Sequence, residues 1–210
     1  MRSNLFSSPQ LYVRQQKEWQ EIVFDFETAN RYEVLDGQKS HVLTVAERSG
    51  GILQTVKRWI LGSHRPLQID VYDQAGQHQL LLSRTFFWFF SDLFVTDAGG
   101  NQLGSVHRRF SVFYKNYDLV SSGGHIFAYV KAPRWRIWTF PIRDLEGNVM
   151  GEISKKWSGF LSEAFTDADT FLVDFGGNDW AQNQRALIFA AAISIDFDFF
   201  ENKDFNFKKQ

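Results

Sequence analysis

A repeat with a period of about 24 residues runs through the middle of this 210-residue chain. Residues 95–110 read VTDAGGNQLGSVHRRF and residues 142–157 read IRDLEGNVMGEISKKW, so Asp, Gly and Asn recur at matching positions. Weaker copies begin at Asp73 and Ser121. Asp and Gly are typical of tight turns, because Asp bonds its local backbone and Gly accepts positive φ. The repeat therefore predicts a meander of antiparallel hairpins.

The composition favours β structure around one core. Aromatic residues make up 17% of the chain, and 22 residues are Phe. Residues 32–45 look like a further hairpin, and closing such a meander into a barrel removes its exposed strand edges. We therefore expect one mainly β domain over residues 18–201, with a short N-terminal extension over 1–17 and a polar tail over 202–210.

The apolar run near the C-terminus constrains the core of this domain. Its uncharged part, residues 186–195, would span only about 15 Å as a helix, whereas a bilayer core needs roughly 20 apolar residues. A single-pass membrane helix is the alternative, but a helix that is apolar on all faces can equally be buried in protein. We expect a central helix inside the barrel, with these residues in its core: Ala186, Leu187, Phe189, Ala190 and Ile193.

Both ends of this helix carry polar signals. The spacing of Asp179 and Gln182 is that of a capping box. At the other end, Asp196 and Asp198 are expected to mark where the helix leaves the core. Acidic residues at a helix C-terminus oppose the helix dipole, which indicates a basic partner or a bound cation nearby.

Four segments resemble the phospholipid scramblase family. They are KKWSGFLSEAFTDADTF at 155–171, IDFDFFE at 195–201, FETANRYEV at 26–34 and RPLQIDVYDQAGQ at 65–77. The resemblance implies a tubby-like fold, a closed antiparallel β-barrel around a central hydrophobic C-terminal helix. It also implies that the protein binds membrane phospholipids and redistributes them between leaflets. The alternative is a soluble tubby-like module that binds lipid or protein without transport.

The resemblance further implies a Ca²⁺ segment, with Asp167, Asp169 and Asn178 at the liganding positions. As an EF-hand loop the segment is poor, because Leu172 stands where the loop needs Gly and no bidentate Glu closes it. A solvated acidic turn is the other interpretation. Ca²⁺ is the one cofactor that the resemblance implies.

The connections that follow each returning strand mix basic and aromatic residues. In a meander these connections lie at the end opposite the Asp-Gly turns. The resemblance adds a second point: family members carry a lipidated cysteine cluster where this cysteine-free chain has TFFWFF at 85–90. Anionic lipids attract basic residues by about 1 kcal/mol each, and aromatic side chains favour the headgroup boundary. The sequence therefore predicts a rim that contacts lipid. The alternative is that the aromatic residues belong to the core and the cations only solvate strand ends. The residues predicted to contact lipid are Arg84, Phe86, Phe87, Trp88, Phe89, Phe90, Arg108, Arg109, Lys131, Arg134, Lys155 and Lys156.

Several function classes are disfavoured. The net charge of −1 gives no global attraction to nucleic acid. The chain lacks GxSxG, P-loop, GxGxxG and HExxH motifs, so we expect no enzyme. We expect a cytoplasmic protein that associates peripherally with membranes, and its expected partner is an anionic phospholipid surface.

Overall fold

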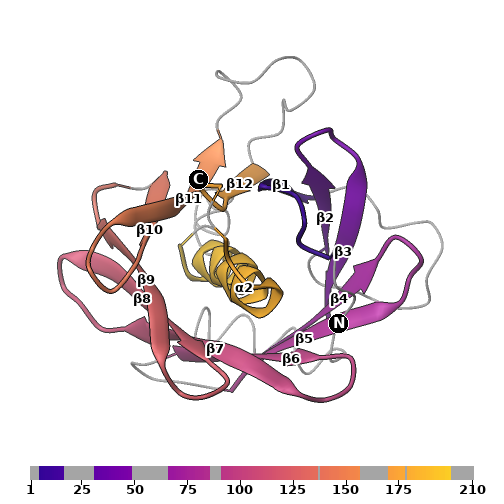
Figure 1. The fold of residues 1–210 in the computed structure, drawn as a ribbon, viewed down its shortest axis with the longest axis horizontal. Helices are drawn as coiled ribbons and strands as arrows, with labels where there is room; N and C mark the ends of the chain where they lie inside the picture. The colour runs from indigo at the N-terminus through magenta and orange to yellow at the C-terminus, as the bar shows by residue number, and fades with distance from the viewer. Residues whose placement is uncertain are drawn as a thin grey trace, which may run out of the picture.

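The computed structural model describes residues 5–16, 31–48, 66–85, 91–136, 138–156, 170–177 and 179–199. In this part of the chain, strands form a closed antiparallel barrel around one helix (Figure 1). The expected mainly β fold with a central helix is confirmed. The elements are β1 (Gln10–Gln15), β2 (Arg31–Asp36), β3 (His41–Glu47), β4 (Leu67–Asp73), β5 (His78–Arg84), β6 (Ser91–Asp97), β7 (Gln102–Arg109), β8 (Tyr114–Ser121), β9 (Ile126–Pro133), β10 (Thr139–Arg143), β11 (Val149–Lys156), β12 (Thr170–Asp174) and α2 (Gln182–Phe199).

The repeat corresponds to hairpins in which one turn geometry recurs. In the strongest copies, Asp97 N donates to Asn101 O at 2.9 Å and Asp144 N donates to Asn148 O at 3.1 Å. Each turn also places a glycine at positive φ, as the tight reversal requires: Gly76, Gly100, Gly124 and Gly147. These turns lie at one end of the barrel, which we call the turn end.

The turn carboxylates predict a local acid response. Asn101 lowers the pKa of Asp97 through its backbone N–H and then its side chain. Because the folded pKa is depressed, this stabilisation is complete above the ordinary value of 3.8 and is lost as pH falls through the lowered pKa. The amide resonances of Gly99 and Asn101 should therefore titrate below that value. Asp97→Asn should abolish this titration, and an unchanged titration in the variant would refute the assignment.

The N-terminal boundary predicted from sequence is wrong. Residues 10–15, placed in an extension, form β1, which pairs with both β12 and β2 and so closes the barrel. Its inward side chains Leu11 and Val13 are buried. A strand with only two inward-facing apolar residues gives a weak signal alone, and its place depends on partners far along the chain. Residues 5–9 also belong to the fold, because Arg185 Nη1 donates to Phe6 O and Ser8 O, each at 3.0 Å.

Helix α2 is sheathed by the strands, as expected from its all-round apolar character (Figure 1). The five residues predicted in its core are at most 1% exposed: Ala186, Leu187, Phe189, Ala190 and Ile193. The predicted capping box is displaced: Gln184 Oε1 accepts the N–H of Ala181 at 2.9 Å, and Arg185 N donates to Ala181 O. Among the described residues, no helix combines the length and the hydrophobicity needed to cross a membrane.

Gly104 sets how closely β7 approaches the helix. A Cβ at this position would lie 2.2 Å from Val120 O and 2.8 Å from Leu187 Cδ1. Gly104→Ala should therefore lower the free energy of unfolding by about 2–3 kcal/mol, measured by urea denaturation. Gly37→Ala is the matched control, because a Cβ at Gly37 meets nothing within 4 Å. Equal stability of the two variants would contradict the close approach.

Candidate functional site

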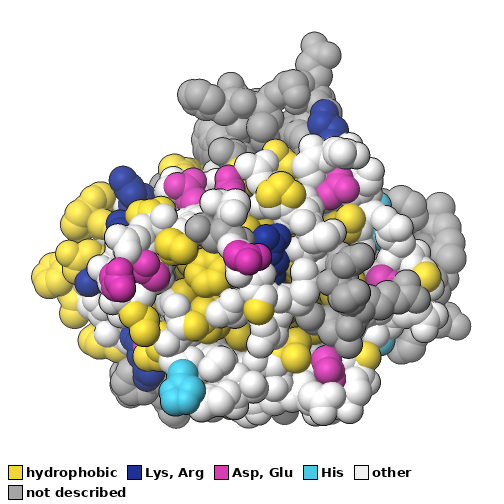
Figure 2. All heavy atoms as spheres, in the orientation of Figure 1, with side chains coloured by type: hydrophobic (Ala, Val, Ile, Leu, Met, Phe, Trp, Pro, Cys, Tyr) yellow, Lys and Arg dark blue, Asp and Glu magenta, His cyan; other side chains and the backbone are white. Residues whose placement is uncertain are grey.

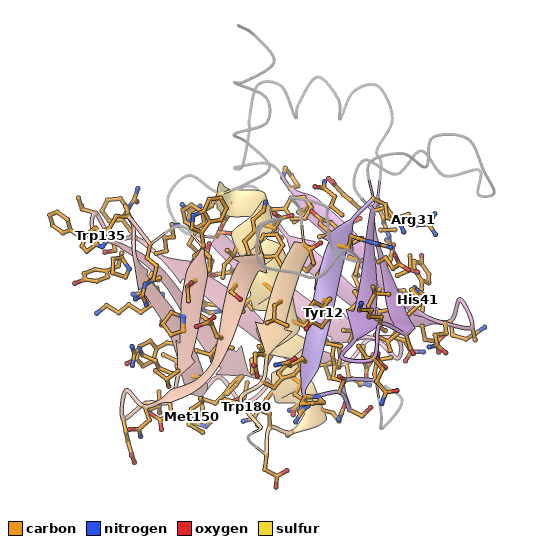
Figure 3. The ribbon with its side chains drawn as sticks, turned by 90° about the horizontal axis from the view of Figure 1, so that it is seen from above. Tyr12, Arg31, His41, Trp135, Met150 and Trp180 are labelled. Carbon is orange, nitrogen blue, oxygen red and sulfur yellow. The ribbon has the colours of Figure 1, made fainter. Side chains whose placement is uncertain are left out.

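The two ends of the barrel differ in what they expose. Trp180 and Met150 lie at the turn end, whereas Trp135 lies at the opposite end (Figure 3). Helix α2 begins at the turn end, so its C-terminal residues Asp196, Asp198 and Phe199 lie toward the opposite end. There the β7–β8 and β9–β10 connections join: Arg134 N donates to Phe113 O at 2.9 Å, and Arg134 Nη2 donates to Ser111 O at 3.0 Å.

The inner wall near the helix C-terminus carries a layer of cations. Arg84, Arg108 and Lys155 occupy the same repeat position, eleven residues after Asp73, Asp97 and Asp144. Arg84 is 3% exposed and pairs with Asp198, with Nη1 to Oδ1 at 3.1 Å. The prediction that Arg84 faces lipid is therefore wrong, because alternation along β5 turns its side chain into the barrel.

Arg108 and Lys155 are only partly accessible from outside. Arg108 Nη1 lies 3.5 Å from Asp198 Oδ2, and its guanidinium stacks on the Phe199 ring at 5.3 Å. Lys155 Nζ stacks on the Phe171 ring at 5.0 Å. Both face the interior, so neither is a simple surface cation.

The sequence suggested that Asp196 and Asp198 mark where the helix leaves the core, but the structure buries both. They are 5% and 8% exposed, and they accept hydrogen bonds from Tyr32 Oη at 2.6 Å and Tyr117 Oη at 2.7 Å, respectively. Burial, and then the Asp198 charge, raises the pKa of Tyr117 well above its ordinary value. The basic partner expected from the helix dipole is Arg84, with Arg108 beside it.

The outward-facing residues at this end form a surface that we call the basic rim. Its cations Arg109, Lys131, Arg134 and Arg136 are exposed. Its apolar members are among the most exposed large hydrophobic residues described: Phe110 64%, Val112 60%, Phe113 65%, Tyr114 38%, Trp135 74% and Trp138 37%. Lys131 Nζ lies over the Tyr114 ring at 4.7 Å, so charges and rings alternate across the surface.

The structure brings together only part of the predicted site. Arg109, Lys131 and Arg134 share the basic rim. Phe86, Phe87, Trp88, Phe89 and Phe90, the candidate Ca²⁺ ligands Asp167, Asp169 and Asn178, and the Lys156 side chain lie outside the described residues. Within the described ranges, no group of three His, Cys, Asp or Glu residues could hold a metal ion. The Ca²⁺ site stays a prediction.

The prediction placed the aromatic-rich β7–β8 and β9–β10 connections at the rim, but from them it selected only cations as lipid-contacting residues. Phe110, Phe113 and Trp135 lie beside predicted cations but were not selected, because an aromatic residue near a strand end is as typical of a core as of a surface. The available signal was position: all three fall in short connections between paired strands.

A Ser–His–Asp row lies outside the barrel on β6 and β7. Ser105 Oγ is 2.7 Å from His107 Nε2, but His107 Nδ1 is 3.7 Å from Asp92 Oδ1. That distance is too long for the hydrogen bond that orients a catalytic imidazole. These residues also lie within paired strands. The backbone N–H groups there donate to neighbouring strands and do not form an oxyanion hole. Its geometry does not support nucleophilic catalysis.

Comparison with known proteins decides the family. Residues 2–202 match the family model described as Scramblase. The chain belongs to the scramblase family. It is 24% identical to altered inheritance rate of mitochondria protein 25 of Saccharomyces cerevisiae, over 94% of this chain and 72% of that protein.

Two further relatives bear the phospholipid scramblase name. A phospholipid scramblase family protein of Schizosaccharomyces pombe is 26% identical over 93% of this chain and 60% of its own length. Mouse phospholipid scramblase 1 is 29% identical over 91% of this chain and 61% of its own length. The scramblase-family chain therefore spans about three fifths of these two relatives. No solved structure matches it.

Proposed function

We propose that this scramblase-family domain docks on anionic phospholipid bilayers through the basic rim and takes part there in phospholipid redistribution. The observation that carries the proposal is the joining of exposed aromatic residues and cations in two connections at one barrel end. Aromatic side chains favour the headgroup boundary, and cations nearby are attracted to anionic headgroups.

The charge distribution supports one orientation. The turn end carries many acidic side chains, and acidic residues are spread over that face in Figure 2. At the left edge of the same view, over β8–β10, hydrophobic and basic side chains lie side by side. An anionic surface would attract the basic rim and repel the turn end. The acidic residues at the turn end are Asp36, Asp73, Asp97, Asp144, Glu146, Asp174 and Asp179.

The burial of α2 favours peripheral attachment. Its residues 186–198 are buried by the strands, so the apolar run is already satisfied inside the protein. Contact with the bilayer then falls to the rim connections. This supports peripheral association with the membrane surface.

Vesicle binding tests the proposal. Phe113→Ser with Trp135→Ser should weaken co-sedimentation with phosphatidylserine-containing vesicles at least about 30-fold, taking about 1 kcal/mol for each half-inserted ring. The matched control, Leu145→Ser with Val149→Ser, removes two exposed apolar side chains at the turn end and should bind normally. Equal loss in both pairs, or none in the first, would refute docking through the rim.

Redistribution is a separate step and needs its own assay. The names of the two phospholipid scramblase relatives support transport, whereas a helix enclosed by a barrel offers no evident path for lipid. In reconstituted vesicles with dye-labelled lipid, the proposed function predicts accelerated flip-flop that depends on Phe113 and Trp135. Binding without flip-flop would leave a lipid-binding module that shares the fold without transport.

A further inference from the structure

A small pocket opens within the basic rim, between the β7–β8 connection and the end of α2. Phe199 of α2 lines it together with residues from β7, β8 and the β7–β8 and β9–β10 connections. The lining residues are Arg108, Arg109, Phe110, Ser111, Tyr114, Lys115, Asn116, Arg134 and Phe199.

All charged residues in the described part of this lining are positive. Four of the described lining residues are cations, and none is a carboxylate. Two described carboxylates that pair with lining arginines are already engaged: Asp198 also pairs with Arg84 at 3.1 Å, and Asp118 accepts from Arg109 Nε at 2.7 Å. Arg108 Nη1 lies farther from Asp198, at 3.5 Å, so this carboxylate does not use all the N–H donors of the Arg108 guanidinium. The imbalance indicates an anionic ligand.

The sides of the pocket suit a compact, highly charged group. Arg108 approaches from the inner wall. Arg134 approaches from the β9–β10 connection, where its Nη2 donates to Ser111 O. Guanidinium forks match phosphate oxygens in pairs. Ser111 and Asn116 add neutral polar groups to the lining.

We propose that this pocket binds the terminal phosphate of a lipid headgroup, a phosphomonoester. A monoester phosphate carries about −1.5 to −2 charges near pH 7 and three strong acceptor oxygens. A phosphodiester carries one charge and has substituents on both sides, so it cannot present three free oxygens to the pocket. The inference rests on the proposed docking, which gives the pocket a headgroup to select.

The neighbouring apolar residues favour a lipid-borne phosphate over a free one. Phe110 and Tyr114 belong to the lining, and Phe113 and Trp135 are exposed in the same two connections. When these rings enter the headgroup boundary, the pocket lies at the level of the headgroups. A phosphate anchored there meets the pocket at a high local concentration, unlike a soluble ester.

Two neighbouring arginines provide the test. Arg134 lines the pocket, whereas Arg136 is also exposed in the same connection but is not among the described lining residues. Binding is measured to vesicles containing phosphatidic acid or phosphatidylserine, adjusted to the same surface potential. The wild-type chain should prefer phosphatidic acid by at least about fivefold, as expected for charge-assisted pairs. Arg134→Gln should lose this preference and Arg136→Gln should keep it.

The outcomes separate the pocket from the docking. If the two vesicles bind equally, or if both variants lose the preference alike, general electrostatics explains binding and the pocket is refuted while docking stands. A soluble arm uses millimolar glycerol 3-phosphate with thermal unfolding as readout. A stabilisation that depends on Arg134, with no binding to either vesicle, would refute a lipid-borne ligand and the docking together. Vesicle preference much stronger than the soluble effect supports the proposal.

Discussion

Replacing Arg84 with Met should lower the free energy of unfolding by about 3–5 kcal/mol. The Arg84 side chain is 1% exposed and the Asp198 side chain 0% exposed, and the pair is joined at 3.1 Å. Removing the guanidinium leaves a buried carboxylate whose remaining partners among the described residues are Tyr117 at 2.7 Å and Arg108 at 3.5 Å. Desolvation of Asp198 would then be poorly compensated. Chemical denaturation monitored by circular dichroism measures the loss.

The matched control is Arg14→Gln at a surface pair. Arg14 Nη2 and Glu33 Oε2 are 2.6 Å apart, but their side chains are 31% and 20% exposed. Such a pair contributes only about 0–1 kcal/mol. A similar small loss for Arg84→Met would contradict a buried ion pair at the helix end. The double variant Arg84→Met with Asp198→Asn should recover part of the loss, because it no longer leaves a buried charge unpaired.

Truncating Phe189 should be about as damaging. The side chain is fully buried at the centre of α2, and its ring lies 5.5 Å from that of Phe6. Phe189→Ala should cost about 3–5 kcal/mol, since strands on all sides limit collapse into the cavity. The exposed residue Val149, changed to Ala, is the control and should change stability by less than about 0.5 kcal/mol. A loss near 1 kcal/mol for Phe189→Ala would contradict a helix enclosed by the barrel.

The periodic part of the fold was predictable because its signals are local. Asp and Gly recur wherever the chain reverses, and each turn forms from residues within a few positions of Asp97 or Asp144. The helix was equally predictable, because a helix that is apolar on all faces must be buried in protein or in lipid. By contrast, β1 depends on pairing with β12, about 160 residues away, and its short sequence gave no hint of that partner.

The site was less predictable because side-chain direction alternates along a strand. Arg108 and Arg109 are neighbours in sequence, yet Arg108 faces Asp198 inside the barrel while Arg109 reaches Asp118 on the outer face. A one-residue shift along the strand therefore decides whether a cation joins a core ion pair or faces outward. The repeat could have predicted part of this arrangement. Arg84 and Arg108 align in the repeat, and both side chains face the inner wall of the barrel.

Site-directed spin labelling tests the central claim most directly, because the chain has no native cysteine. A nitroxide is placed at Phe113→Cys in the basic rim or at Leu145→Cys in the turn end, two sites that are each 65% exposed. On anionic vesicles, the label at 113 should gain collision with oxygen and lose collision with a polar nickel reagent, while the label at 145 stays in water. Insertion of the label at 145, or an aqueous environment for both, would contradict docking through the basic rim.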